Sequence, residues 1–208
     1  MSLVDSIRDH VREHRSGMVS DLLFALVLRY YGLSSSMSVS FRGMVGHDAS
    51  LIFPETDTGA VQIADRAGNV YLEMERSGAI LDDPSITEAF IRRYAAFSGR
   101  NFPEFLEPLM RQQGVMFNPS RPMVLYDSMT FSLQAGPSPG LDMEISDASL
   151  DVAGRRADEW LHFRISDGDR PVGTGSKKVV ISGLQPWDEA RMQAFIHDYA
   201  ARRDGQPA

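Results

Sequence analysis

The residue whose type and position point most clearly to chemistry is Asp21. Ser20 and Asp21 directly precede seven consecutive apolar residues, 22–28, and this pattern predicts a helix over 18–31 that is buried on every face. A carboxylate in the first turn of a buried helix is favoured as an anion by the helix dipole, and the unpaired backbone amides of that turn can bind an oxygen atom of a substrate. The alternative is an acidic residue that only complements the helix dipole, which is common in helices.

Histidines offer two further candidate sites. His10 and His14 flank Glu13 in the H-x-x-E-H spacing of some zinc enzymes. That site needs a buried helix and a third ligand, whereas this segment is polar, so a solvated helix face is the better interpretation and we expect no metal. His47, followed by Asp48, lies in a loop between two expected strands, where functional residues often occur. It is either a proton donor or one of a pair of turn residues.

The elements that must position these residues alternate between helix and strand along the chain. Helical spacing and helix-end signals predict helices over 1–15, 18–31, 86–97, 102–113 and 187–203. Alternating apolar residues predict strands over 37–41, 51–53, 61–63, 70–75, 123–133, 141–152, 161–165 and 172–181. The alternation changes phase at Ser146 and Asp147, which predicts a bulge there. The expected fold class is α+β.

Composition excludes several classes of protein. The chain has 208 residues, of which 43% are hydrophobic and 24% charged, and these are values of a globular protein. It has no Cys, which excludes disulfides, thiolate metal sites and Cys nucleophiles. A net charge of −7 argues against a nucleic-acid-binding protein. The longest apolar run is far too short to span a membrane, so we expect a soluble, cytoplasmic protein.

An internal repeat relates the two halves of the sequence. Residues 36–41 (SMSVSF) match residues 128–133 (SMTFSL), and each segment is preceded by helix and followed by a hairpin with an acidic, Gly-containing turn. The alternative is two unrelated meanders with chance similarity. If the segments are equivalent strands, the two halves can join their sheets edge to edge, and Asp21 would then meet strands of the second half.

A helix wrapped by a curled antiparallel sheet resembles the hot-dog fold, and a tandem of two such units resembles the double hot-dog acyl-CoA thioesterases and hydratases. The resemblance implies an N-terminal hot-dog-like unit over 1–82, with a leading helix, and a C-terminal unit over 83–208, with a terminal helix. The two units would form one cooperative double hot-dog.

The candidate site residues follow from the same resemblance. Ser20-Asp21-Leu22 is similar to the Ser-Asp-Leu start of the second helix in acyl-CoA thioesterase II enzymes, which implies that Asp21 activates or orients the water that attacks the thioester. The family's Thr or Ser falls near Ser36 and its Gln at about Arg76. The resemblance therefore implies Asp21 and Ser36 as catalytic candidates, and Ser20 and Arg76 as substrate contacts. His47, from its position in a loop between strands, is a further catalytic candidate.

A second stretch is similar to the lead-in of the (R)-specific enoyl-CoA hydratase motif, at residues 86–99. The family's Asp, Asn and His fall on Arg100, Phe102 and Phe105, so no acid–base pair remains for hydration at that position.

The function favoured by the sequence is hydrolysis of acyl-CoA or acyl-carrier-protein thioesters, without a cofactor. A non-catalytic hot-dog protein that binds an acyl group or another apolar ligand is the alternative from a different class. A hydratase or dehydratase that uses His47 as its base is a third hypothesis. A homodimer is compatible with each, because symmetric dimers are the commonest oligomers.

Overall fold

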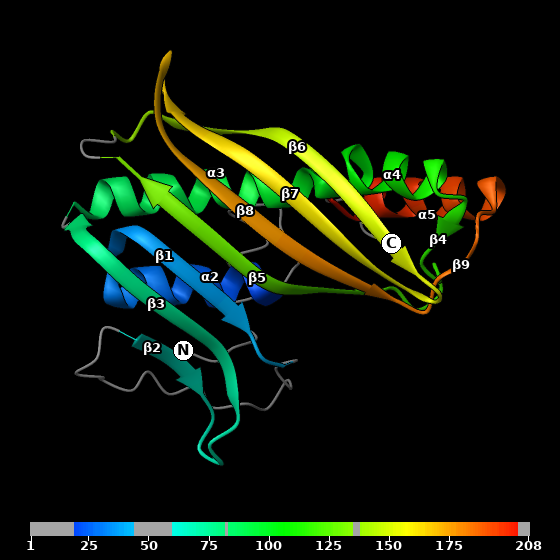
Figure 1. The fold of residues 1–208 in the computed structure, drawn as a ribbon, viewed down its shortest axis with the longest axis horizontal. Coiled ribbons are helices and arrows are strands. Elements are labelled where there is room, and N and C mark those ends of the chain that lie inside the picture. Colours follow the sequence, from blue (N-terminus) through cyan, green and yellow to red (C-terminus); the bar gives the residue numbers. More distant parts are fainter. Residues whose placement is uncertain (1–18, 44–59, 82, 135–137, 204–208) are drawn as a thin grey trace.

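The structure is a computed structural model that describes residues 19–43, 60–81, 83–134 and 138–203 (Figure 1). The expected helix over 1–15, the strand over 51–53, and His10, His14 and His47 lie outside the described residues. The helices are α2 (Val19–Tyr31), α3 (Pro84–Glu104), α4 (Leu106–Gln112) and α5 (Glu189–Arg203). The strands are β1 (Leu33–Phe41), β2 (Ala60–Ala64), β3 (Val70–Leu81), β4 (Val115–Met116), β5 (Met123–Leu133), β6 (Leu141–Ala153), β7 (Arg156–Asp167), β8 (Arg170–Ser182) and β9 (Gln185–Pro186).

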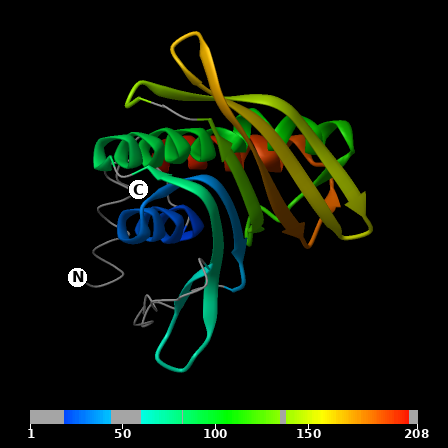
Figure 2. The ribbon, with the colours of Figure 1, turned by 60° about the vertical axis from the view of Figure 1, so that its left-hand side comes forward.

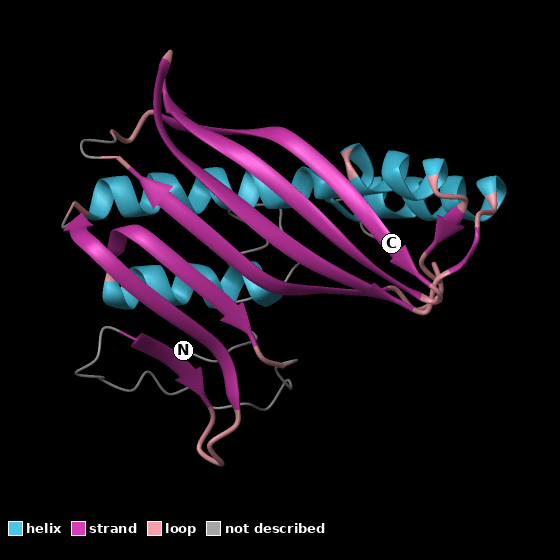
Figure 3. Cartoon of the chain, in the orientation of Figure 1, coloured by secondary structure: helices cyan, strands magenta, loops and turns pink. Residues whose placement is uncertain are grey.

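A large antiparallel sheet is the main element, so the expected α+β class is confirmed. Within the described residues seven strands form this sheet, in the order β2-β3-β1-β5-β8-β7-β6, and β4 pairs separately with β9. The predicted bulge in β6 is present, because the register with β7 shifts between Ile145 and Asp147. Figures 2 and 3 show that the sheet curves around the helices, which lie on one of its faces.

The two halves of the chain join in the middle of this sheet, as the repeat predicted. Strand β1 pairs antiparallel with β5, with Ser36 opposite Ser132 and Ser40 opposite Ser128. The repeat equates residue 36 with residue 128 and residue 40 with residue 132. The pair of Ser36 and Ser132 is therefore equivalent to the pair of Ser128 and Ser40, so the register is symmetric about the pair of Ser38 and Thr130. The matched segments are therefore related by an approximate two-fold axis that passes between the two strands.

Each long helix begins and ends for local reasons. In α2, Asp21 lies in the first turn, and the helix ends at Gly32, whose φ of 80° suits glycine. In α3, Asp83 is the N-cap and accepts a hydrogen bond from the Ser85 backbone amide at 2.8 Å. The expected stop of this helix near residue 98 was wrong. The helix continues to Glu104 with a break at Phe102, because Ser98 is buried and its side chain is bonded within the core.

The helices pack on the sheet through two apolar clusters among the described side chains. The first surrounds Phe24 of α2, whose ring stacks on Phe131 of β5 at 5.3 Å between centroids. The second lies under α4 and α5 and includes Leu106 and Met192. Tyr94 belongs to the first cluster and Tyr126 to the second, and buried polar residues lie where the two meet. None of the helices in the described ranges is both long and apolar enough to span a lipid bilayer.

Candidate functional site

A pocket of about 410 Å³ lies between α5, the end of α3, the start of α4 and β5. Most of its wall is apolar, and the side chains that form this part are Phe102, Leu106, Phe117, Val124, Phe195 and Tyr199. Ser120 and Asp198 also line it and are exposed, so they mark its mouth. Its most buried polar lining residues are Ser98, Asn101 and Tyr126, which are 4%, 6% and 6% exposed. The pocket therefore combines apolar walls with a small polar end, as ligand sites commonly do.

The Ser98 hydroxyl connects this pocket to two buried charged residues, Asp21 and Lys177. Ser98 donates a hydrogen bond to Asp21 Oδ1 at 3.0 Å and accepts one from Lys177 Nζ at 2.8 Å. The Tyr126 hydroxyl oxygen is 2.5 Å from Ser98 Oγ. Since the one proton of Ser98 is directed to Asp21, Tyr126 is the donor in that contact. We call Asp21, Ser98, Tyr126 and Lys177 the buried network.

Burial controls the protonation of this network. Lys177 is fully buried, and the loss of hydration lowers its pKa to about 8, although the charges of Asp21 and Glu159 oppose the change. Its ammonium group lies 3.3 Å from the centre of the Tyr126 ring and 5.5 Å from that of Tyr94, and these contacts also stabilise the cation. Burial, together with the charge of Asp21, raises the pKa of both tyrosines well above the usual value.

A second buried pair, Asn101 and Glu159, lies beside the network. The Asn101 side-chain amide donates to Glu159 Oε2 at 2.8 Å. Burial raises the pKa of Glu159 to about 7. Asn101 Oδ1 and Glu159 Oε1 are buried and have no hydrogen-bond partner among the described residues. A proton on Glu159 would give this pair a second donor, which is a reason for the carboxyl group to be neutral at mildly acidic pH.

Several elements far apart in the sequence bring these side chains together. Asp21 comes from the first turn of α2, Ser98 from α3, Tyr126 from β5 and Lys177 from β8. In β8 the burial alternates, so that Lys177 shares the helix-facing side of the sheet with Val179 and Ile181. Asp21 is linked to β5 and β8 of the second half through Ser98 of α3.

Ser98, Lys177 and Glu159 are not indicated as site residues by any motif in the sequence. Ser98 was interpreted as a helix end. Lys177 and Glu159 carried a usable signal, because each replaces an apolar residue in the inward phase of an alternating strand. A buried ionisable residue at such a position is rare unless it is paired.

Of the remaining predicted site residues that the structure describes, Ser36 and Arg76 lie away from Asp21. Ser20 precedes it and is half-buried. Ser36 alternates with the buried Met37 and lines a groove on the opposite face of the sheet. Arg76 donates through Nη1 to the backbone carbonyl of Tyr31, at the C-terminal end of α2. Ten residues of helix separate that end from Asp21, a rise of about 15 Å.

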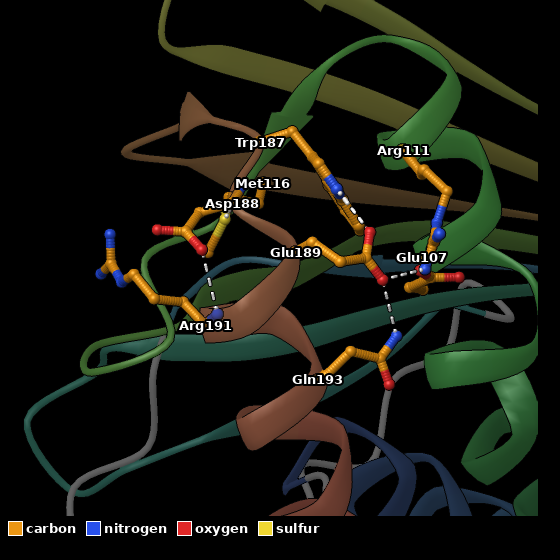
Figure 4. Close-up of polar contacts among 8 residues, drawn as sticks. All are labelled: Glu107, Arg111, Met116, Trp187, Asp188, Glu189, Arg191 and Gln193. Atoms are coloured by element: carbon orange, nitrogen blue, oxygen red, sulfur yellow. Dashed lines mark hydrogen bonds and ion pairs between the residues drawn. The ribbon is translucent and has the colours of Figure 1, made fainter.

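Contacts between α4 and the start of α5 hold α5 over the pocket (Figure 4). Arg111 of α4 bonds to Glu107 at 2.8 Å and to Glu189 of α5 at 2.9 Å. The Trp187 indole donates to Glu189 at 3.0 Å, and the Arg111 guanidinium lies 5.1 Å from the centre of that ring. These contacts position the Phe195 and Tyr199 side chains, which form one wall of the pocket.

Within the described part of the chain, no group of three or more His, Asp or Glu side chains is arranged to hold a metal ion.

Comparisons with known proteins give one family and a distant set of solved structures. No curated protein matches the sequence. An acyl-CoA thioesterase II from Mycobacterium marinum is 11% identical, with a TM-score of 0.48 over 82% of this chain and 90% of that chain. A TesB protein from Mycobacterium avium subs paratuberculosis is 8% identical, with a TM-score of 0.42 over 78% of this chain and 85% of that chain. Residues 7–190 match the family model described as "Protein of unknown function (DUF3581)", and the chain belongs to that family.

Proposed function

We propose that this protein handles acyl thioesters, of coenzyme A or of acyl carrier protein, and that it hydrolyses them. The observation that carries the proposal is the apolar pocket whose polar end holds the Ser98 hydroxyl, hydrogen-bonded to Asp21. An acyl chain fits apolar walls, and a thioester carbonyl at the polar end would lie beside Ser98 and Asn101. The Ser20-Asp21-Leu22 resemblance, made from the sequence, independently points to the same carboxylate.

Asp21 has the role of proton acceptor in this proposal. It is 1% exposed, and Ser98 lies between it and the pocket. The proton released when the thioester carbonyl is attacked therefore reaches Asp21 through the Ser98 hydroxyl. When the C–S bond breaks, the thiolate takes that proton and leaves as a thiol. The nearby Lys177 ammonium and Tyr126 hydroxyl keep Ser98 Oγ oriented through both transfers.

The double hot-dog arrangement, with units 1–82 and 83–208, belongs to the same proposal. The symmetric pairing of β1 with β5 supports it, and so does the buried network, which takes Asp21 from one unit and its partners from the other. The units would then fold only together. A fragment of residues 83–208 that is soluble and cooperatively folded would contradict this arrangement.

The experiment that tests the function is a panel of acyl-CoA thioesters of increasing chain length, with free thiol detected during the reaction. Hydrolysis gives thiol in proportion to substrate consumed. An absorbance change at the acyl group without thiol release would instead indicate hydration or dehydration, the hypothesis in which His47 was the base. Substrates that are bound without any change would indicate a binding protein.

A binding protein is the second candidate, and one observation favours it. The Asp21 carboxylate does not line the pocket, because Ser98 and Tyr126 cover it. In that case the buried network stabilises the core, and the pocket holds an acyl group or another apolar ligand. Saturable acyl-CoA binding with no thiol release, unchanged by Asp21→Asn, would establish this function over hydrolysis.

A further inference from the structure

Ser98 lies between the pocket and a base that can accept its proton, and a buried cation orients its oxygen. Its side chain lines the pocket, so a bound carbonyl group can reach it. Its proton is directed at a carboxylate, Asp21 Oδ1, at 3.0 Å. Its oxygen receives a hydrogen bond from the Lys177 ammonium group at 2.8 Å. Nucleophilic catalysis by a hydroxyl requires an adjacent base for its proton, and Asp21 provides that base. Since Ser98 Oγ accepts hydrogen bonds from both Lys177 and Tyr126, the Tyr126 contact has to open before Oγ can attack a carbonyl group.

We propose that Ser98 is the catalytic nucleophile and forms a covalent acyl-enzyme; this inference rests on the proposed function. Ser98 Oγ attacks the thioester carbonyl carbon and its proton passes to Asp21. The C–S bond breaks, the thiolate takes the proton from Asp21, and the acyl group remains on Ser98 as an ester. Water then attacks that ester, gives its proton to Asp21, and the proton returns to Ser98 Oγ as the carboxylic acid leaves.

The arrangement of hydrogen bonds suits both halves of this reaction. An acylated Ser98 has no proton and no longer donates to Asp21 Oδ1. Because Ser98 and Tyr126 cover Asp21 in the structure, the incoming water reaches this carboxylate when the acylated side chain turns away from it. Lys177 remains a donor to the same oxygen. Its charge offsets the negative charge that Asp21 and an attacking Oγ would otherwise bring together in a buried site.

Tyr126 and Ser120, which also carry hydroxyl groups on the pocket, are weaker candidates. The pKa of the Tyr126 phenol is raised well above its usual value by burial and by the charge of Asp21, so it serves better as a donor to Ser98. Ser120 lines the same pocket but is exposed at its mouth. It therefore provides a matched control, because a Ser120→Ala variant removes the same atom from the same pocket.

The chain offers a further, unusually selective variant. Because it contains no Cys, a Ser98→Cys substitution introduces a single thiol at the proposed position, with a stronger nucleophile in place of the hydroxyl. A Ser120→Cys variant is its control. An acyl group transferred from acyl-CoA to the first thiol and not to the second would show that the position, and not general thiol reactivity, directs the attack.

The experiment uses the full chain and two readouts. Wild-type protein is mixed with an acyl-CoA that it hydrolyses, quenched in acid and analysed by mass spectrometry, and separately treated with a fluorophosphonate probe that labels activated serines. We expect an acyl adduct and a phosphonyl adduct that both map to Ser98. Ser98→Ala should lose both adducts and release thiol at least about 100-fold more slowly, while Ser120→Ala keeps both adducts on Ser98. Circular dichroism verifies the fold of each variant. If Ser98→Ala does not fold, an acyl adduct on Ser98→Cys supports the nucleophile at this position, and its absence overturns it.

The outcomes separate this inference from the proposed function. Thiol release that persists unchanged in folded Ser98→Ala overturns the nucleophile and leaves hydrolysis standing, as does wild-type turnover without adduct or probe labelling. A wild-type protein that releases no thiol from any acyl-CoA overturns the proposed function. Probe labelling of Ser98 in that same protein would still support the nucleophile, whereas its absence would overturn both.

Discussion

The two faces of the central sheet carry two very different polar regions. The outer face holds a groove of about 1060 Å³, lined by hydroxyl-bearing residues that include Ser36, Ser38, Thr130 and Ser176. The helix-facing side holds a smaller pocket, of about 410 Å³, with apolar walls and the buried network at its end. The larger groove is open and its side chains remain hydrated. The smaller pocket ends where polar groups are removed from water and bonded to one another, and burial is what changes their chemistry.

Neighbouring residues of one strand show the same contrast. Lys177 of β8 faces the helices and is fully buried, with a pKa lowered to about 8. Lys178, the next residue, is on the other face, where it forms an ion pair with Asp158 at 2.9 Å. Because side chains alternate between the two faces of a strand, Lys177 belongs to the buried network while the adjacent Lys178 forms an ion pair on the outer face.

The largest effect on stability should come from removing the buried cation. Lys177→Met keeps the volume of the side chain but leaves Asp21 buried without its neighbouring cation, and we expect a loss of about 3–5 kcal/mol in the free energy of unfolding at pH 7. Lys178→Met removes the outer ion pair and should cost about 1 kcal/mol or less. Urea unfolding of both variants measures the difference, and equal losses would break the comparison between the two faces.

A smaller, pH-dependent effect should follow from Glu159→Gln. The pKa of Glu159 is raised from 4.5 to about 7, so the folded protein binds this proton more tightly than the unfolded chain does. The stability from this group is present below about pH 4.5 and is lost as the pH rises through 7. Gln cannot ionise, and its amide can donate to Asn101 Oδ1. We therefore expect the variant to gain up to about 3 kcal/mol relative to wild type between pH 5 and pH 8.

Urea unfolding at several pH values in that window measures this gain. Glu144→Gln, at an exposed position of β6, is the matched control and should follow the wild-type pH dependence. A Glu159→Gln curve parallel to that of the wild type would mean that Glu159 is ionised throughout the window, against the burial argument.

The smallest effect is expected on the outer face. Thr130 and Ser176 share a hydrogen bond of 2.7 Å between their hydroxyls, but water can replace either partner there. Thr130→Val should change the free energy of unfolding by about 0.5 kcal/mol or less, because surface substitutions usually stay within that range. A loss several times larger, measured by urea unfolding, would show that the polar side chains of this groove stabilise the fold as strongly as the buried network does.

Much of the fold was predictable from the sequence, because local patterns determine it. The all-apolar run after Asp21 indicated α2, and the phase change near Ser146 indicated the bulge in β6. The repeat indicated that the two halves can join their sheets, and they do so between β1 and β5. The end of α3 was not predictable, since the burial of Ser98 overrides a local stop signal.

The candidate site was predictable only in part, because it depends on contacts over long sequence separations. Asp21 was found from its position at a helix start. Ser98 is 77 residues from Asp21 and 79 residues from Lys177, and no local pattern joins them. Arg76 was placed near Asp21 by the resemblance, whereas the structure puts it at the opposite end of α2.

The measurement that tests the account most directly compares one variant on each face in the same thiol-release assay. Asp21→Asn keeps the shape of the side chain but cannot accept the proton passed on by Ser98, and we expect turnover of acyl-CoA to fall at least about 100-fold with an unchanged circular dichroism spectrum. Ser36→Ala, in the outer groove, should retain wild-type turnover. Unchanged turnover in Asp21→Asn, or a loss confined to Ser36→Ala, would contradict a catalytic site in the inner pocket.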